Sequence, residues 1–138
     1  MNREAIKQIL PHREPMLLVD EAEVEDGVST GRYTVRGEEW FLQGHFPGNP
    51  VVPGVILCEM MAQSACMLLA ERAGAGMTPY FTSLDKVRFK RMVVPGDTVT
   101  FTCKLTAQKG PFYFCEGRGH VDGTLCISGT FSFAVKEG

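Results

Sequence analysis

The chain has 138 residues, of which 22% are charged, and its formal net charge is -2. This length suits one domain over 1–138 with a core that needs neither disulfides nor a metal. The small negative charge gives no general attraction to nucleic acid or to an acidic membrane surface, so these two classes of partner are not expected. The longest apolar stretch, 55–70, is interrupted by Glu59, Gln63 and Ser64, which argues against a membrane span. We therefore expect a cytoplasmic protein.

The five cysteines are odd in number and lie inside apolar segments. None forms a C-x-x-C pair or stands near a histidine at the spacing of metal ligands. We predict reduced thiols in the core and no metal site.

The first third of the chain predicts three elements. Residues 3–10 have helical spacing of apolar side chains and end before a proline, which predicts a short helix. Segments 16–26 and 28–36 are rich in Val, Leu, Tyr and Thr and predict two strands. Asp26 and Gly27 between them are typical of a hairpin turn.

A shaped loop and a long helix follow. The stretch 44–55 holds three prolines and three glycines in twelve residues, so it cannot be regular structure. Residues 54–73 contain no proline and predict a helix that is apolar on nearly all sides. Such a helix is buried all round and should form the centre of the fold.

The second half of the chain predicts four strands, at 80–90, 98–106, 112–121 and 124–135. The segments 98–106 and 124–135 alternate apolar and polar residues, as expected of strands with one buried face. A sheet that curls its apolar face around one helix satisfies this order of elements. The predicted class is α+β, of the hot-dog type.

Glu59 is the anomaly of the predicted central helix. Its neighbours Leu57, Cys58, Met60 and Met61 cannot replace the hydration of a carboxylate, so we expect its pKa to be raised. A carboxyl that keeps a proton near neutral pH can act as a general acid. Gln63 at i+4 can hold one of its oxygens. A plainer alternative is that Glu59 faces water or pairs with an arginine.

His45 lies in the shaped loop, just before the helix. A loop histidine is usually a surface or capping residue, but this one is accompanied by a rigid loop, a helix N-terminus and an acid within fifteen residues. The free N–H groups near Gly54 and Val55 can form an oxyanion site, and Gly54 lets a carbonyl approach closely. A base, an acid and oxyanion donors suit β-elimination next to a carbonyl.

Seven short segments stand in order along the chain: Leu10-Pro11-His12-Arg13, Leu17-Leu18-Val19-Asp20, Gly44-His45-Phe46-Pro47-Gly48, Pro53-Gly54-Val55, Glu59-Met60-Met61-Ala62-Gln63, Arg88-Phe89-Lys90-Arg91 and Val94-Pro95-Gly96-Asp97. Together they resemble the bacterial (3R)-hydroxyacyl-acyl carrier protein dehydratases of type II fatty acid synthesis. The resemblance covers nearly the whole chain.

This resemblance implies a function and an assembly. His45 would remove the C2 proton of a 3-hydroxyacyl thioester, Glu59 would protonate the departing C3 hydroxyl, and the Gly54 N–H would bind the thioester carbonyl. The product would be a trans-2-enoyl thioester. The substrate would arrive on the phosphopantetheine of acyl carrier protein, and no other cofactor is implied. The family forms homodimers, often as a trimer of dimers, in which His45 of one chain works with Glu59 of the other.

Other features leave alternatives open. Phe46, Val55, Met60, Tyr80 and Phe81 either line an acyl tunnel or belong to the ordinary core. The cations at Lys86, Arg88, Lys90 and Arg91 form either a docking patch for an acidic carrier protein or a solvated strand face. We expect His12 and His120 to be structural.

Three rival functions remain open at this point. They are a dehydratase that also isomerises trans-2 to cis-3 double bonds, a hot-dog thioesterase, and a silent acyl-carrier-binding module. The run Gly37-Glu38-Glu39-Trp40-Phe41-Leu42 replaces the Asn-Glu-Pro-Phe-Phe of many relatives, which leaves the acyl chain length open.

Overall fold

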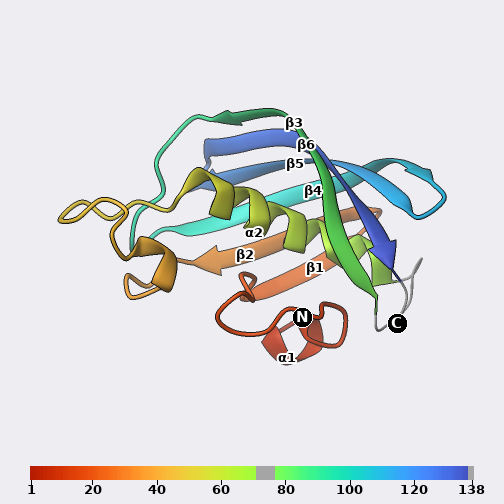
Figure 1. The fold of residues 1–138 in the computed structure, drawn as a ribbon, viewed down its shortest axis with the longest axis horizontal. Helices are drawn as coiled ribbons and strands as arrows, with labels where there is room; N and C mark the ends of the chain where they lie inside the picture. The colour runs from red at the N-terminus through yellow and green to blue at the C-terminus, as the bar shows by residue number, and fades with distance from the viewer. Residues whose placement is uncertain (71–76, 137–138) are drawn as a thin grey trace.

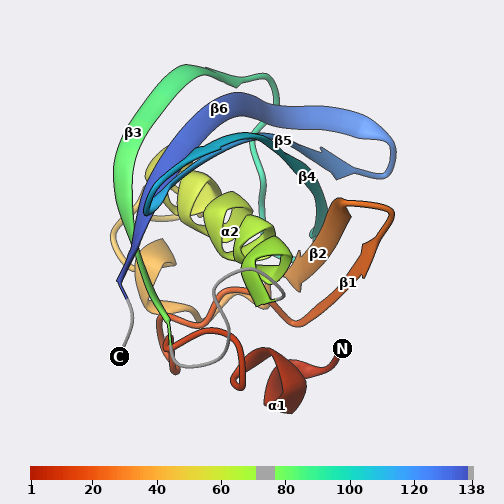
Figure 2. The same ribbon diagram turned by 90° about the vertical axis from the view of Figure 1, so that its right-hand side faces the viewer.

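A six-stranded antiparallel sheet curls around one helix in the computed structural model, which describes residues 1–70 and 77–136 (Figures 1 and 2). The elements are α1 (Arg3–Ile6), β1 (Glu21–Glu25), β2 (Val28–Thr34), α2 (Gly54–Cys66), β3 (Thr78–Phe89), β4 (Thr98–Lys109), β5 (Phe112–Val121) and β6 (Thr124–Lys136), with short 3-10 turns at Trp40–Leu42 and Met67–Leu69. The strand order is β1-β2-β4-β5-β6-β3, so β3 lies at one edge. The predicted α+β hot-dog class is confirmed, while a single domain over 1–138 stays a prediction.

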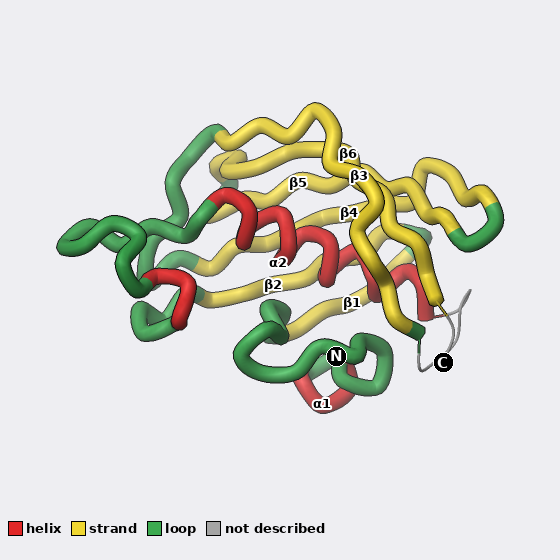
Figure 3. Tube along the Cα trace, in the orientation of Figure 1, coloured by secondary structure: helices red, strands yellow, loops and turns green. Residues whose placement is uncertain are grey.

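Two hairpins follow the predicted turn chemistry. Asp26 and Gly27 have φ angles of 51° and 78° and join β1 to β2. Asp122 and Gly123 do the same between β5 and β6, with φ angles of 49° and 79°. Two successive positive φ angles match the twist of the flanking strands, which is why Asp-Gly pairs favour this turn. In Figure 3, β1 runs beside β2, and β5 runs beside β6.

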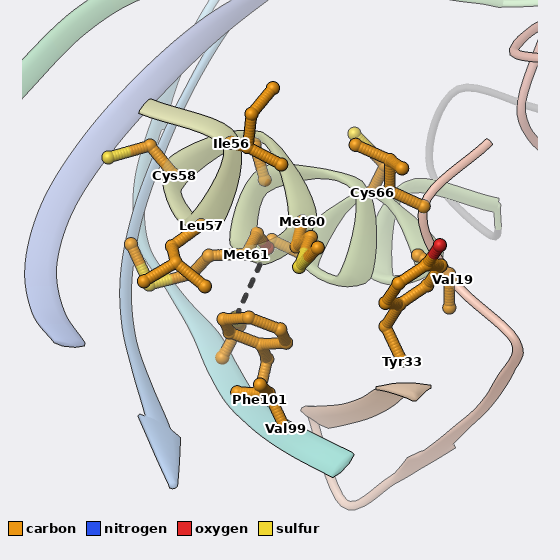
Figure 4. Close-up of a cluster of buried hydrophobic side chains, with 14 of the residues drawn as sticks. Val19, Tyr33, Ile56, Leu57, Cys58, Met60, Met61, Cys66, Val99 and Phe101 are labelled. Atoms are coloured by element: carbon orange, nitrogen blue, oxygen red, sulfur yellow. Dashed lines mark hydrogen bonds between the residues drawn. The ribbon is translucent and has the colours of Figure 1, made fainter. Parts of the chain in front are cut away.

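The core lies between the concave face of the sheet and α2. Val99, Phe101 and Cys103 alternate along β4 and are at most 1% exposed, as their spacing predicts. In Figure 4 the side chains of Val99 and Phe101 extend from β4 on the side that faces α2. The Cys103 thiol donates to the carbonyl of Met61 across this interface, at 3.5 Å. The central position of the predicted helix is therefore confirmed.

All five cysteines are buried and free, as expected: Cys58, Cys66, Cys103, Cys115 and Cys126. Burial raises the pKa of the Cys115 thiol to about 12, and it raises the pKa of Cys66 and Cys103 as well. Thiols of this kind stay protonated at neutral pH and act as small apolar core residues.

Several predicted boundaries are wrong. The first strand begins at Glu21 rather than at residue 16, because 17–19 are buried in irregular backbone. There the N–H of Leu18 donates to the Gln63 side chain instead of to a neighbouring strand. The α-helical part of 3–10 ends at Ile6, and α2 gives way to a 3-10 turn after Cys66. The predicted end of the helix at 71–73 lies outside the described residues.

The predicted polar face of β6 is also partly wrong, because Cys126 and Ser132 are buried. Ser132 is covered by the edge strand β3, where the hydroxyl groups of Thr82 and Ser83 form hydrogen bonds with it. The alternation of residues within one strand does not show whether a neighbouring strand will bury its polar side chains.

Gly31 marks the closest approach of the sheet to α2. A Cβ atom at this position would lie 2.6 Å from the Cβ of Ser64, nearer than real Cβ atoms approach. We expect Gly31→Ala to lower the free energy of unfolding by about 1–3 kcal/mol, because the strand must move away from the helix. Urea unfolding measures the loss. Thr30→Ala on the opposite face of β2 serves as the control, and an equal effect of both changes contradicts the packing argument.

Candidate active site

Glu59 opens into a pocket between α2 and the edge of the sheet. The pocket has a volume of about 180 Å³, and its walls include Ala62, Cys66, Tyr80, Phe81 and Phe133. None of these five side chains is an acid, so the Glu59 carboxyl is the anionic group that faces this cavity. The Glu59 side chain keeps 21% of its accessible surface. A small cavity in which apolar walls meet a few polar side chains, here His12, Glu59 and Gln63, is typical of a binding or reaction site.

Gln63 holds the Glu59 carboxyl in place, as the i+4 spacing predicts. Its Nε2 donates to Oε2 of Glu59 at 2.8 Å and to the carbonyl of Met16 at 2.8 Å. Its Oε1 accepts from the N–H of Leu18, also at 2.8 Å. Because both ends of the buried amide have partners, the side chain cannot rotate without losing several hydrogen bonds.

His12 is the site residue that the sequence analysis missed. Its Nε2 lies 3.4 Å from Oε2 of Glu59, the oxygen that Gln63 also contacts. His12 was expected to be structural because nothing in the sequence connects it with a residue on the central helix. The alternative of an arginine partner for Glu59 is thereby replaced by a histidine partner.

The expected rise of the Glu59 pKa is wrong. Burial raises the pKa, as argued from the apolar neighbours, but the hydrogen bonds from His12 and Gln63 and the charge of His12 outweigh it. The net effect is a lowered pKa. The carboxyl of the free chain is therefore ionised at neutral pH, because stabilising contacts to the charged form exceed the cost of burial.

The His45 ring is fixed by its own loop. Its Nδ1 lies 3.0 Å from the carbonyl oxygen of Val51, and the ring stacks on Phe46 with a centroid distance of 4.2 Å. When Nδ1 donates to Val51, Nε2 carries the lone pair and is the basic nitrogen. The N–H of Val51 also donates to the carbonyl of His45, which closes the loop on itself. This arrangement gives an oriented base.

His45 is not among the residues that line the Glu59 pocket of the same chain. It lies with Phe46, Gly54 and Val55 near the N-terminal end of α2, where Phe46 is 56% and Val55 72% exposed. The core alternative is therefore wrong for these two side chains. Within one chain, His45 and the Glu59 pocket therefore lie at separate places.

Gly54 is the first residue of α2. Helix geometry leaves its N–H and that of Val55 without acceptors inside the helix, while Ile56 and Leu57 donate to the carbonyl of Pro53. The ring of Phe89 packs against Gly54, since a Cβ there would lie 2.8 Å from its Cζ. Free N–H groups at a helix N-terminus are the kind of donor that oxyanion sites use.

Met60, Tyr80 and Phe81 were predicted either to line an acyl tunnel or to belong to the core. Met60 is fully buried in the core, whereas Tyr80 and Phe81 are 54% and 41% exposed on β3.

The predicted alternation of cations along β3 is interrupted by a bulge between Asp85 and Arg88, where Lys86 adopts a positive φ of 52°. Arg91 lies 3.7 Å from Asp97, and Arg88 and Lys90 are exposed.

The comparisons with known proteins decide the family. The family model described as a FabA-like domain matches residues 10–130. The chain belongs to the FabA-like domain family. FabA-like relatives include proteins named 3-hydroxyacyl-[acyl-carrier-protein] dehydratase FabZ. The protein of that name from Caldicellulosiruptor saccharolyticus is 44% identical over 135 residues, which cover 96% of both chains. Its namesake from Clostridium perfringens (strain SM101 / Type A) is 42% identical over 137 residues, covering 98% of this chain and 99% of that one.

Solved structures support the fold of this FabA-like domain. The dehydratase heterocomplex ApeI:P from Xenorhabdus doucetiae matches with a TM-score of 0.79 and 22% identity, covering 96% of this chain and 91% of that one. A hypothetical thioesterase with coenzyme A from Streptococcus pneumoniae TIGR4 matches with a TM-score of 0.64 and 13% identity, covering 85% of each chain. Because dehydratases and thioesterases share this architecture, the fold alone does not identify the reaction.

Two expectations for this FabA-like domain concern a metal site and a membrane-spanning helix. Within residues 1–70 and 77–136, no group of three His, Cys, Asp or Glu side chains is arranged to hold a metal ion. In the same part of the chain, no helix combines the length and apolarity needed to cross a membrane. The absence of a cofactor stays a prediction.

Proposed function

We infer that this chain is a 3-hydroxyacyl-[acyl-carrier-protein] dehydratase of fatty acid biosynthesis, a hydro-lyase in which His45 and Glu59 are the catalytic pair. The observation that carries this inference is the Glu59 carboxyl, which Gln63 fixes at the wall of a pocket, in a chain that also holds the His45 ring by Val51. The family and the two dehydratase relatives at 42–44% identity support the reaction class.

The proposed chemistry is a β-elimination. His45 Nε2 takes a proton from C2 of a (3R)-hydroxyacyl thioester, whose carbonyl oxygen accepts a hydrogen bond from the Gly54 N–H. The C3–O bond then breaks, and the proton held by Glu59 joins the departing hydroxyl as water. A trans-2-enoyl thioester remains. The donors at the start of α2 stabilise the negative charge that develops on the carbonyl oxygen.

The ionised state of Glu59 in the free chain fits this role if substrate binding restores the proton. An acyl chain in the pocket displaces water from the carboxyl, and loss of water raises the pKa of a carboxyl. The acid form then becomes available when the hydroxyl lies next to it. Phe46, Val55, Tyr80 and Phe81 are exposed apolar residues that can line the acyl path.

The assembly that completes the site is a homodimer, arranged as a trimer of dimers. The edge strand β3 exposes Tyr80, Phe81, Leu84 and Phe89. A long apolar edge is normally covered, because it pairs with other chains if left open. A second copy on this edge covers these side chains and adds its His45 loop to the Glu59 pocket.

The substrate is delivered on the phosphopantetheine arm of acyl carrier protein, and the reaction requires no further cofactor. The enzyme works in the cytoplasm, with neither nucleic acid nor membrane as a partner.

Product analysis tests the reaction directly. The wild-type protein is incubated with a (3R)-hydroxyacyl-acyl carrier protein, and the products are identified by mass spectrometry and double-bond position. We expect a trans-2-enoyl product and released water. A cis-3 product in addition would reveal isomerase activity. Hydrolysis of the thioester, or binding of the carrier without reaction, contradicts the proposal and favours a thioesterase or a silent module.

Docking of the carrier is proposed at Arg88, Lys90 and Arg91. We expect Arg88→Glu or Lys90→Glu to raise KM for the carrier-bound substrate roughly tenfold, because opposite charges that guide an acidic partner are reversed. Turnover of a short thioester without carrier should remain unchanged. Lys109→Glu at the far end of β4 is the control. Equal losses with both substrates contradict the docking role.

A further inference from the structure

Two side chains from different parts of the chain contact the same oxygen of Glu59. Gln63 donates to Oε2 from one turn further along α2, and Nε2 of His12 reaches Oε2 at 3.4 Å from the segment after α1. Among the described residues, both polar contacts of this carboxylate go to Oε2. The other oxygen, Oε1, is therefore the one left to meet a substrate hydroxyl.

The second ring nitrogen of His12 has an unusual environment. Nδ1 is buried and has no hydrogen-bond partner among the described residues. If the ring were charged, Nδ1 would carry a proton and bury an unpaired N–H, which costs free energy. Among the described residues, the contact between Nε2 and Oε2 of Glu59 is therefore the polar contact that holds the ring.

Few other titratable groups face this pair within the described chain. Tyr80 from β3 and Cys66 from α2 line the same pocket, and Cys58 precedes Glu59 on the helix. Arg13 follows His12 but donates to the backbone carbonyls of Lys7, Leu10 and His12. Its guanidinium is held by these carbonyls rather than by the Glu59 carboxylate, so among the described residues His12 supplies the contact to Oε2 that comes from outside α2.

We propose that His12 is a positioning residue for the acid of the dehydration, which holds Oε2 of Glu59 and leaves Oε1 directed to the substrate hydroxyl. This inference rests on the proposed role of Glu59 as the acid. It assigns His12 a function through Glu59 and not through direct contact with the substrate.

The test uses two substitutions that separate the hydrogen bond from the charge. His12→Ala removes both, whereas His12→Gln keeps an N–H donor near the position of Nε2 and removes the charge. The Glu59 titration is followed by NMR on protein labelled with ¹³C at the glutamate carboxyls, with the Glu59→Gln spectrum to assign the signal. The values of kcat and KM are measured on the same samples.

We expect His12→Ala to lower kcat by roughly 10- to 100-fold, because a misaimed catalytic group costs rates of this order. KM should stay within about twofold, since the substrate contacts themselves are intact. His12→Gln should recover part of kcat. In both variants the pKa of Glu59 should rise, because the lowering effect of His12 is lost while burial remains.

His120→Gln is the matched control, since His120 lines a separate groove on the sheet beside Lys104 and Arg118. It should change neither kcat nor the Glu59 titration. An unchanged Glu59 titration in the His12 variants overturns the proposal, as does a His12→Gln protein no more active than a folded His12→Ala. If His12→Ala does not fold, the titration of His12→Gln decides alone. Failure of the proposed function is distinguishable, because it appears as an inactive wild type or a fully active Glu59→Gln protein.

Discussion

A His45→Ala protein is expected to lose about 10²- to 10⁴-fold in kcat for dehydration, the usual contribution of a positioned general base. The ring is held by Val51 and stacked on Phe46, so its loss removes the oriented Nε2 without opening the core. The measurement is the rate of enoyl product formation from a 3-hydroxyacyl thioester on its carrier.

Stability provides the control for this variant. Because His45 is only partly buried and lies in a loop, we expect the melting temperature of His45→Ala to stay close to that of the wild type. Retention of more than about a tenth of wild-type kcat would contradict the role of His45 as the base. The addition of imidazole to the folded variant offers a second check, since a small base can enter an exposed loop site.

The second large effect is expected for Glu59→Gln. The amide has the shape of the carboxyl but cannot give up a proton as an acid, so kcat should fall by about 10²- to 10⁴-fold. Oε1 of the new amide can still accept from Gln63, which preserves the anchor to the backbone of Met16 and Leu18. The fold should therefore survive, and the loss should appear in kcat rather than in expression.

Glu116→Gln is the matched control for this change. Glu116 lies on β5 with 46% of its side chain exposed and pairs with Lys104 at 3.0 Å, and it does not line the pocket of Glu59. Exposed pairs contribute little to stability, so this variant should resemble the wild type in rate and in melting temperature. A Glu59→Gln protein that is equally active would show that the acid lies elsewhere.

Much of the fold was predictable because its signals are local. The Asp26-Gly27 turn requires positive φ angles that this pair adopts readily, and the alternation of Val99, Phe101 and Cys103 reflects one strand with one buried face. The apolar character of 54–73 likewise predicts a helix enclosed by other elements, and α2 occupies 54–66 of this range. Each of these features depends on neighbours within a few residues.

The errors arose where distant residues decide. The rise of the Glu59 pKa was expected from its neighbours on the helix alone. Contacts with His12 and Gln63 lower this pKa instead. The bulge at Lys86 and the covering of Ser132 depend on pairing between β3 and β6, which no single segment records. Residues His45, Glu59, Gly54 and Gln63 were selected from the sequence, but the separation of His45 from the Glu59 pocket within one chain is visible only in three dimensions.

The central claim is that His45 of one chain acts with Glu59 of another, and mixing the two inactive variants tests it. His45→Ala and Glu59→Gln proteins are unfolded together, refolded and assayed for dehydration. If the site is shared, each mixed dimer regains one intact site, and random pairing restores about a quarter of wild-type activity. If the mixture forms mixed dimers and stays as inactive as its components, each site belongs to a single chain and the account is wrong.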